Sequence, residues 1–324
     1  MCTAVTYKTR DHYFGRNLDL EYSYNEAVTV TPRNYPFSFR KTGKLDSHYA
    51  MIGVAYVADG YPLYYDATNE KGLSMAGLNF PGNADYKPFC AGRDNVTPFE
   101  LIPWVLGQCA TVAEVEILLA RINILHENFS PELPLSPLHW IISDRDHSIT
   151  LESVSSGINI YDNPVGVLTN NPTFDYHMLH LSSFMGLSRT DPTNTFAPGL
   201  ELKPCSRGMG ALGLPGDASS PSRFVRAAFV KGNSVSGDSE AESVSQFFHI
   251  LKSVEMQRGC VALSSGLYDL TIYSSCCNTD RGIYYYTTYD SNQICAVDMH
   301  REDLDGSELR SFPLVTDTAI HFQN

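Results

Sequence analysis

Apolar and polar residues alternate in short runs through the first third of the chain. Alternation with a period of two, interrupted by turn residues such as Asp59 and Gly60, predicts β-strands. The predicted strands cover residues 2–7, 12–18, 27–32, 49–56, 61–66 and 73–79. This part of the chain is therefore expected to form mainly β-sheet.

Further along, the period lengthens to that of helices. Residues 97–109 and 111–122 predict two helices, and Thr111 and Glu114 have the spacing of a capping box at the start of the second. Strands are predicted again at 138–144, 148–154, 157–162, 166–170, 268–275, 282–290 and 293–299, and helices at 220–232 and 241–254. Such alternating blocks predict the α+β class, with helices outside stacked antiparallel sheets. No segment looks like a linker, so residues 1–324 are expected to form a single domain.

Composition narrows the class of protein. The 324 residues carry a net charge of −13 and 43% of them are apolar, which is typical of a compact globular protein. Nucleic acid and anionic membrane surfaces are not expected as partners, because no run of Lys or Arg provides a cationic patch. No apolar run approaches the roughly 20 residues of a membrane span, and the start lacks the features of a secretory signal. A cytoplasmic enzyme is expected.

The usual metal and cofactor motifs are missing. Eight cysteines are scattered without a C-x-x-C pair, so neither a zinc site nor a disulfide framework is indicated. His177 and His180 have a spacing that can bind a metal on a helix, but no carboxylate accompanies them, which favours a structural role. Gly208 and Gly210 do not open a dinucleotide-binding unit and are interpreted as part of a glycine-rich loop. We expect no metal and no cofactor.

Cys2 is the first candidate for chemistry. Methionine in front of a small residue is readily removed, and loss of Met1 would give Cys2 both a thiol and a free α-amine. A thiol has a pKa of about 8.5 and an α-amine one of about 7.7 to 8.0, so near neutral pH the amine can accept the thiol proton. Cys2 could therefore act as a nucleophile with its own base. Because a cysteine near a terminus is usually incidental, this hypothesis needs support from other residues.

That support comes from several motifs that occur in one order along the whole chain. These are the start MCT and the segments FGRNLDLE, NEKGLSMAGLNFP, VLTNNPTFDY, GLPGDASSPSRF and GIYYYTTYD. Together they resemble the choloylglycine hydrolase family, which contains the bile salt hydrolases and the penicillin V acylases. The resemblance implies an N-terminal nucleophile hydrolase with a four-layer αββα sandwich, in which Cys2 attacks an amide carbonyl and forms a thioester acyl-enzyme.

The resemblance also implies the catalytic residues, motif by motif. Besides Cys2, they are Arg16 and Asp19 from FGRNLD, Asn79 from AGLNFP, Asn170 from VLTNNP and Arg223 from SPSRF. Asp19 would position the α-amine, and the two arginines would stabilise the thiolate and nearby negative charge. Asn79 and Asn170 would form the oxyanion hole. Any one of these residues alone would be assigned to surface or turn structure; their joint occurrence with Cys2 favours catalysis.

Within the family, Asn79 favours the bile salt hydrolases, because the penicillin acylases tend to carry tyrosine there. The expected substrates are bile acids conjugated to glycine or taurine, and the family's binding loops point to Leu18, Ala58, Tyr65, Phe129 and Leu133 for the steroid. Each of these could equally be ordinary core packing. The resemblance also implies a homotetramer.

The acidic end of the substrate is assigned to a glycine-rich segment. Ser206 and Arg207, in KPCSRGMGALGLPG, are predicted to contact the sulfonate or carboxylate of the conjugate and to favour taurine. Arg207 could instead be a solvated loop charge. Two alternatives to a bile salt hydrolase stay open: a penicillin V acylase with the same catalytic residues, and a binding protein that needs no free N-terminal cysteine.

Overall fold

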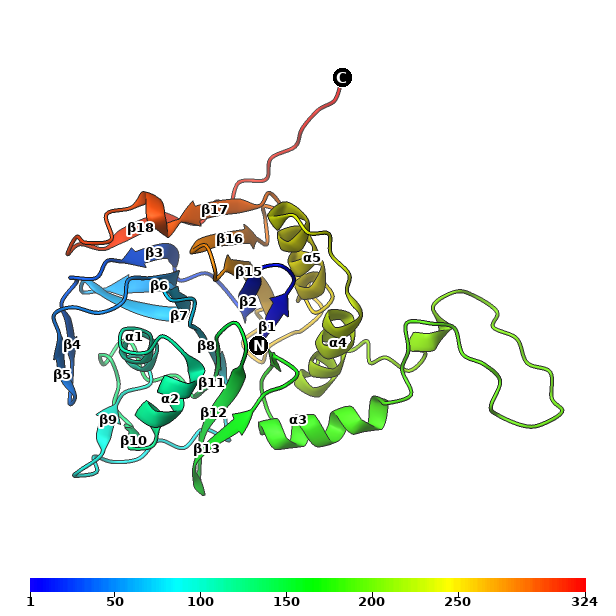
Figure 1. Cartoon of the computed structure of the whole chain (residues 1–324), viewed down its shortest axis with the longest axis horizontal. Coiled ribbons are helices and arrows are strands. Elements are labelled where there is room, and N and C mark those ends of the chain that lie inside the picture. The colour runs from blue at the N-terminus through cyan, green and yellow to red at the C-terminus, as the bar shows by residue number, and fades with distance from the viewer.

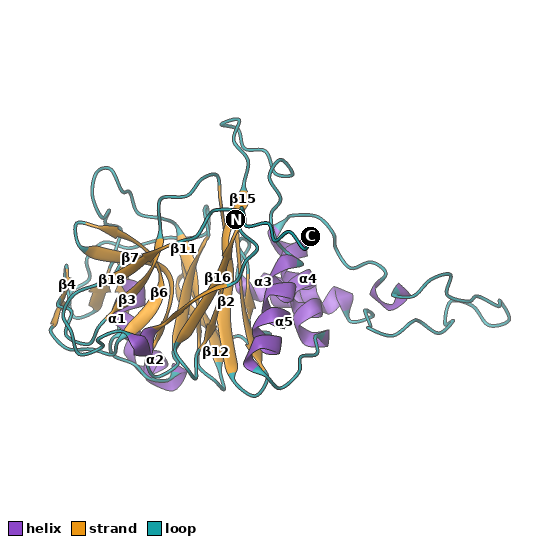
Figure 2. Ribbon diagram, turned by 90° about the horizontal axis from the view of Figure 1, so that it is seen from above, coloured by secondary structure: helices purple, strands orange, loops and turns teal.

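Two β-sheets packed face to face, with helices on both outer sides, form the body of the protein (Figure 1). The computed structural model describes residues 1–324. Seen from above, the layers follow one another as helices, sheet, sheet and helices (Figure 2). The predicted α+β class and four-layer αββα sandwich are confirmed.

Sheet A has six antiparallel strands in the order β14-β1-β2-β15-β16-β17. Its strands are β1 (Cys2–Lys8), β2 (His12–Leu20), β14 (Val167–Leu168), β15 (Leu270–Asn278), β16 (Ile283–Thr288) and β17 (Cys295–Asp298). The central strands β1 and β2 are buried over nearly their whole length. The polar side chains on them must therefore find partners inside the protein.

Sheet B has eight strands in the order β13-β12-β11-β8-β7-β6-β3-β18. They are β3 (Ala27–Thr31), β6 (Met51–Ala58), β7 (Tyr61–Asn69), β8 (Ser74–Asn79), β11 (Leu138–Ser143), β12 (Ser148–Val154), β13 (Gly157–Asp162) and β18 (Arg310–Pro313). Two small pairs lie outside the sandwich: β4 (Phe37–Phe39) with β5 (Gly43–Leu45), and β9 (Asp94–Val96) with β10 (Ile122–Ile124). These four strands and β18 were not predicted; none exceeds four residues.

The helices cover the two outer faces. They are α1 (Leu101–Leu106), α2 (Val112–Leu119), α3 (Phe174–Leu181), α4 (Ser220–Asn233) and α5 (Glu240–Lys252). Short 3-10 turns lie at η1 (Ser182–Phe184), η2 (Met209–Ala211) and η3 (Met299–Arg301). α4 and α5 pack on sheet A, and α1 packs on sheet B. Thr111 caps α2 through the Glu114 N–H, but the Glu114 carboxylate accepts from Ala110, so only half of the predicted capping box forms.

The apolar core has two parts, one on each side of sheet B. One part fills the space between the sheets and under α4 and α5, and includes Phe14, Val28 and Phe224. The other lies between sheet B and the helices α1 and α2, and includes Trp104 and Trp140. No helix in the fold combines the length and the apolar composition that crossing a bilayer requires.

One stretch leaves the body. The projecting segment, residues 182–216, extends well beyond the sheets and returns to α4, as both views show (Figures 1 and 2). It contains large apolar side chains that are mostly exposed, among them Met185, Phe196 and Leu212, at 84%, 83% and 77%. It also contains Ser206 and Arg207, both exposed.

Candidate active site

The hairpin of β1 and β2 brings Cys2 to Asp19. Strand pairing places Cys2 opposite Leu18, and the Asp19 N–H donates to the Met1 carbonyl at 2.9 Å. Both Cys2 and Asp19 are buried, with exposures of 3% and 0%. The segment FGRNLD is thus the strand that runs alongside the candidate nucleophile.

Asn170 and Arg223 reach Cys2 from the other side. Asn170 follows β14 in the loop before α3, and Arg223 lies in the first turn of α4. The Cys2 N–H donates to Asn170 Oδ1 at 2.8 Å, and Arg223 donates to the Cys2 carbonyl and, at 2.7 Å, to the same Oδ1. Burial lowers the pKa of Arg223, and the charges of Asp19 and Cys2 partly oppose this. Asn170 and Arg223 therefore fix the main chain of residue 2.

Asn79, at the end of β8, is held by Asn170. The Asn170 Nδ2 group donates to the main-chain oxygen of Asn79 at 2.6 Å, while the side-chain amide of Asn79 has no hydrogen bond within the protein. Asn170 keeps its second Nδ2 hydrogen. At least one unused amide N–H on each asparagine is therefore available to a negatively charged oxygen.

Arg16 lies deeper, between the two sheets, and is fully buried. Its Nη1 donates to the carbonyls of Tyr65 and Gly77 at 3.0 and 2.6 Å, while its Nη2 has no partner. Burial alone would lower the pKa of Arg16, but the neighbouring Cys2, Tyr273 and Asp66 raise it above its ordinary value. Arg16 therefore stays charged in the protein interior.

Asp19 keeps one oxygen unused. Its Oδ1 accepts from the Thr271 hydroxyl at 2.6 Å, and its Oδ2 is buried without a partner. Burial raises the pKa of Asp19, and the terminal ammonium and Arg223 oppose the rise. The amine that removal of Met1 would create on Cys2 is a suitable donor for this oxygen.

Asp66 is a buried residue that the sequence did not indicate. It lies on β7 next to Tyr65, and accepts hydrogen bonds from the hydroxyls of Tyr273 and Tyr284, both at 2.6 Å. Burial raises the pKa of Asp66, and the charge of Arg16 opposes this. An aspartate in the otherwise apolar run YPLYYD was the signal in the sequence, but only the packing of β15 and β16 reveals its partners.

Two buried histidines support the loop that carries Asn170. His139 contacts Glu152 at 3.1 Å and the Thr169 carbonyl at 2.9 Å, and His177 contacts the Asn170 carbonyl at 2.9 Å. Burial lowers the pKa of His177 to about 4, so this ring is neutral near pH 7. His177, noted in the sequence for its spacing to His180, thus lies directly behind the site.

Among the residues predicted to bind the steroid, two lie next to Cys2 or Arg16. Leu18 pairs with Cys2, and the Tyr65 carbonyl accepts from Arg16. Ala58 ends β6 and pairs with Tyr61, whose ring contacts that of Phe129. The N–H of Leu133 donates to Ser130 within the same loop.

Ser206 and Arg207 are not brought to this group. Both lie on the projecting segment, and neither side chain makes a hydrogen bond or an ion pair within the chain. Their predicted contact with the acidic end of the substrate stays a prediction.

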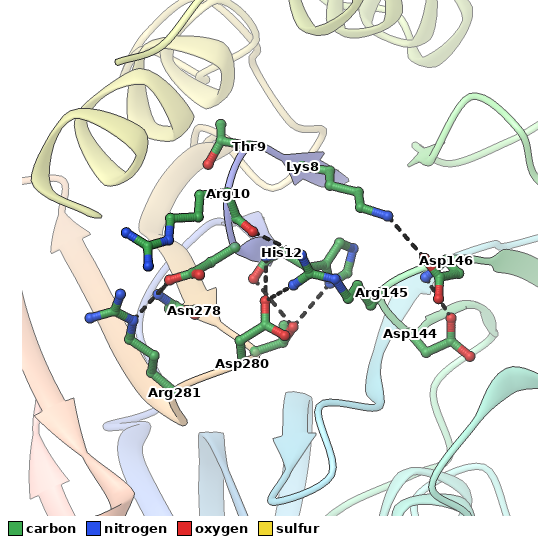
Figure 3. Close-up of polar contacts among 12 residues, drawn as sticks. Lys8, Thr9, Arg10, His12, Asp144, Arg145, Asp146, Asn278, Asp280 and Arg281 are labelled. Atoms are coloured by element: carbon green, nitrogen blue, oxygen red, sulfur yellow. Dashed lines mark hydrogen bonds and ion pairs between the residues drawn. The ribbon is translucent and has the colours of Figure 1, made fainter. Parts of the chain in front are cut away.

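A second charged cluster lies at the other end of β1 and β2 (Figure 3). There, Arg145 pairs with Asp280 and Lys8 with Asp146, on exposed side chains. A cavity of about 570 Å³ opens beside them, and it is lined mainly by polar residues such as His12 and Lys231. A steroid site needs an apolar wall, which the lining of this cavity does not provide, so the cavity does not fit the predicted substrate.

Comparisons with known proteins agree on one family. The family model of the linear amide C–N hydrolases, choloylglycine hydrolase family, matches residues 2–312. A protein of Lactiplantibacillus plantarum named bile salt hydrolase/transferase is 56% identical over the full length of both chains. One of the same name from Clostridium perfringens is 39% identical, again over the full length of both.

Solved structures agree as well. The C2A mutant of the conjugated bile acid hydrolase of Clostridium perfringens superposes with a TM-score of 0.92, at 37% identity and full coverage of both chains. The penicillin V acylase of Agrobacterium tumefaciens has a TM-score of 0.77 at 20% identity, with coverage of 97% of this chain and 92% of its own. The second likeness concerns the fold alone.

Proposed function

The chain belongs to the choloylglycine hydrolase family of linear amide C–N hydrolases, and from this premise we propose that it cleaves the amide bond of glycine- and taurine-conjugated bile acids. The observation that carries the proposal is full-length similarity to a bile salt hydrolase/transferase at 56% identity. The buried group of Cys2, Asp19, Asn170 and Arg223 supports it, because their contacts suit a nucleophile beside an amine and an oxyanion site.

Removal of Met1 is the first step of the proposed mechanism. The Met1 amine lies beside the buried residues around Cys2, where it donates hydrogen bonds to the Asp19 carbonyl and to the Asp269 carboxylate. Its removal uncovers the Cys2 thiol and converts the Cys2 N–H into a free amine, for which Asn170 Oδ1 and Asp19 Oδ2 are acceptors. Asp19 then holds that amine beside the sulfur.

Acylation follows from this arrangement. The Cys2 amine takes the thiol proton, and Sγ attacks the carbonyl carbon of the amide. The oxyanion is stabilised by N–H groups of Asn79 and Asn170, a kind of contact that contributes about 2.7 to 4 kcal/mol per donor in other enzymes. The leaving amine takes the proton from the Cys2 ammonium, and water then hydrolyses the thioester.

Arg16 supplies a fixed positive charge beneath the sulfur. It is buried, and the Cys2 charge is the largest of the influences that raise its pKa. Its unpaired Nη2 is free to face a thiolate. Asp66 and its two tyrosines support this charge from below.

The remaining substrate contacts follow the sequence predictions. Leu18, Ala58, Tyr65, Phe129 and Leu133 are proposed for the steroid, and Ser206 and Arg207 for the acidic end of the conjugate. The ratio of kcat/KM for taurocholate to that for glycocholate, in the wild type and in Arg207→Ala, tests the last assignment. An unchanged ratio in the variant removes Arg207 from the site.

Acyl transfer is proposed as a second activity of the same site. The relatives from L. plantarum and C. perfringens are both named hydrolase/transferase. A thioester reacts with a primary amine as well as with water, so the same acyl-enzyme can return a new amide.

A homotetramer is proposed for the assembled protein. The projecting segment carries exposed Met185, Phe196 and Leu212, and large apolar side chains in a projecting segment are suited to burial against another copy of the chain. Light scattering should report about four times the mass of the chain, and Phe196→Ser should weaken the assembly. A stable monomer at working concentration would refute the homotetramer.

A cytoplasmic location is also proposed for the protein, and cell fractionation tests this proposal.

The decisive test compares substrates on processed protein. Intact-mass spectrometry first establishes that Met1 has been removed, since a retained Met1 contradicts the mechanism. Release of cholate from glycocholate and taurocholate is then measured beside hydrolysis of phenoxymethylpenicillin. Faster cleavage of the penicillin would assign the chain to the acylases, and binding without turnover would assign it to the binding proteins.

A further inference from the structure

The structure contains a bound primary amine beside Cys2, namely the chain's own terminus. The Met1 ammonium donates to Asp269 Oδ2 and to the main-chain oxygen of Asp19, both at 2.8 Å. Burial lowers the pKa of this amine, but the charges of Cys2, Asp19 and Asp269 together raise it above its ordinary value. The position is therefore built to hold a positively charged nitrogen.

The Asp269 carboxylate has no hydrogen-bond partner other than the Met1 amine. Its exposure is 5%, its Oδ2 bonds only Met1, and its Oδ1 is buried without a partner. Arg223, the nearby cation, directs its side-chain N–H groups to Cys2, Thr3, Asn170 and Ala218 and bonds neither Asp269 nor Asp19. A buried carboxylate without a partner is costly, so loss of Met1 leaves a group that requires a new donor.

Two carboxylates then face one new amine. Asp19 Oδ2 is also unpaired, and the Asp19 N–H bonds the Met1 carbonyl, which places Asp19 beside the peptide bond whose nitrogen becomes the Cys2 amine. The Cys2 ammonium satisfies Asp19. Asp269 remains for a second amine that arrives from outside.

We propose that Asp269 and the main-chain oxygen of Asp19 form an ammonium-binding site that, in the processed enzyme, takes the primary amine of an acceptor amino acid for acyl transfer. The inference rests on the proposed function, since it requires an acyl group on Cys2. It assigns a role to a residue that lies outside the predicted catalytic set.

The reaction balances without any further reagent. In the acyl-enzyme the Cys2 amine is free, because the leaving amine has taken its proton. The bound ammonium gives one proton to this amine, and its nitrogen attacks the thioester carbonyl carbon. The carbon–sulfur bond breaks, the sulfur leaves as thiolate, and it takes the second proton from the same nitrogen. The products are a new amide and Cys2 with a thiol and an ammonium. In the hydrolytic direction the same site receives the departing glycine or taurine amine.

The test is a partition experiment with Asp269→Asn. Taurocholate is the acyl donor, and L-alanine at neutral pH is the acceptor. New conjugate and free cholate both arise from one acyl-enzyme, so their ratio is insensitive to a general loss of activity. We expect the ratio to fall at least about tenfold, since the variant keeps the shape of the side chain but removes the negative charge that pairs with the ammonium. Asp290→Asn, which removes an exposed carboxylate, should leave the ratio at the wild-type value.

Hydroxylamine serves as the matched acceptor. It is uncharged near neutrality, so formation of the hydroxamate needs no carboxylate, and its ratio to cholate should change less than about twofold in Asp269→Asn. An equal fall with both acceptors would assign Asp269 to general positioning and overturn the proposal. Wild-type enzyme that releases cholate but forms no alanine conjugate would overturn it as well. Wild-type enzyme that releases no cholate, with or without hydroxylamine, would instead refute the proposed function on which it rests.

Discussion

The two ends of the β1–β2 hairpin carry charged residues that differ in burial and in hydrogen bonding. At the Cys2 end, Arg16, Asp19 and Asp269 are buried, and each leaves one charged atom without a hydrogen bond. At the other end, about 20 Å away along the strand, Lys8 and Arg145 are half exposed and pair with neighbouring aspartates (Figure 3).

This difference distinguishes charges that can take part in a reaction from charges that only keep the surface solvated. An exposed ion pair is solvated on one side and contributes little to stability, so its presence needs no functional explanation. Buried charges with unused hydrogen-bonding capacity are costly, so a cluster of them identifies a candidate functional site. At the far end, the buried side-chain atom without a hydrogen-bond partner is the amide oxygen of Asn278, and this atom carries no charge.

Replacing the nucleophile should produce the largest effect at the Cys2 end. Cys2→Ser should lower kcat/KM for taurocholate by at least about a thousandfold, because a hydroxyl is much harder for an amine to deprotonate than a thiol. Thermal unfolding should show a fold as stable as the wild type. Cys90→Ser, at an exposed cysteine, is the control and should keep full activity. Wild-type turnover by Cys2→Ser would remove Cys2 from the mechanism.

Loss of a hydrogen-bond donor to the oxyanion should produce the second largest effect on activity. Asn79→Ala should lower kcat for glycocholate by about 10² to 10³, the effect of removing one such donor in other enzymes. The KM value should change little, because the contact strengthens only in the transition state. Asn292→Ala, on an exposed loop, serves as the matched control. A rise in KM at unchanged kcat would make Asn79 a binding residue instead.

The strands of the Cys2 end were predictable from their own pattern, whereas the site residues there were assigned by resemblance to the family, and their catalytic roles stay predictions. Residues 2–7 and 12–18 were predicted as strands and form β1 and β2, and α4 begins within the predicted helix that carries Arg223. Predictions of long elements agree with the structure because the period of their apolar residues determines their type.

Asp66 and Asp269 could not be predicted, for a physical reason. Each is a single aspartate near or within an apolar strand, which looks like a residue on an exposed edge. Their surroundings depend on contacts between β7, β15 and the terminus, more than 200 residues apart in sequence for Asp66 and Tyr273. The strands β4, β5, β9 and β10 have three residues each and were missed for a related reason, since their pairing partners define them and their own sequence shows no period.

Two buried histidines, one at each end, give a pH dependence of stability. Burial lowers the pKa of His177 and of His12 to about 4, against about 6.5 in the unfolded chain. The unfolded state therefore binds more protons between these values, so stability is fully present above pH 6.5 and is lost as the pH falls toward 4. Each ring accounts for up to about 3 kcal/mol.

Variants separate the two histidines. His12→Gln and His177→Gln should each flatten the dependence of the unfolding free energy on pH between 6.5 and 4, as measured by urea denaturation. His147→Gln, at an exposed ring, should leave it unchanged. Only His177→Gln should also lower kcat, because His177 bonds the Asn170 carbonyl. A loss of kcat in His12→Gln would contradict the separation of the two ends.

The smallest effect is expected from the surface charges at the far end. Arg281 donates to Asp11 and Glu240, and its side chain is 47% exposed. Because both contacts compete with water and lose strength in salt, Arg281→Ala should cost under about 1 kcal/mol in low salt. The cost should shrink further at high ionic strength, and kcat/KM for taurocholate should equal that of the wild type at either salt concentration. Urea denaturation at the two salt concentrations, with steady-state kinetics on the same samples, measures both quantities. A fall in kcat/KM in this variant would mean that the far end communicates with Cys2 through β1 and β2, and the division between the two ends would then fail.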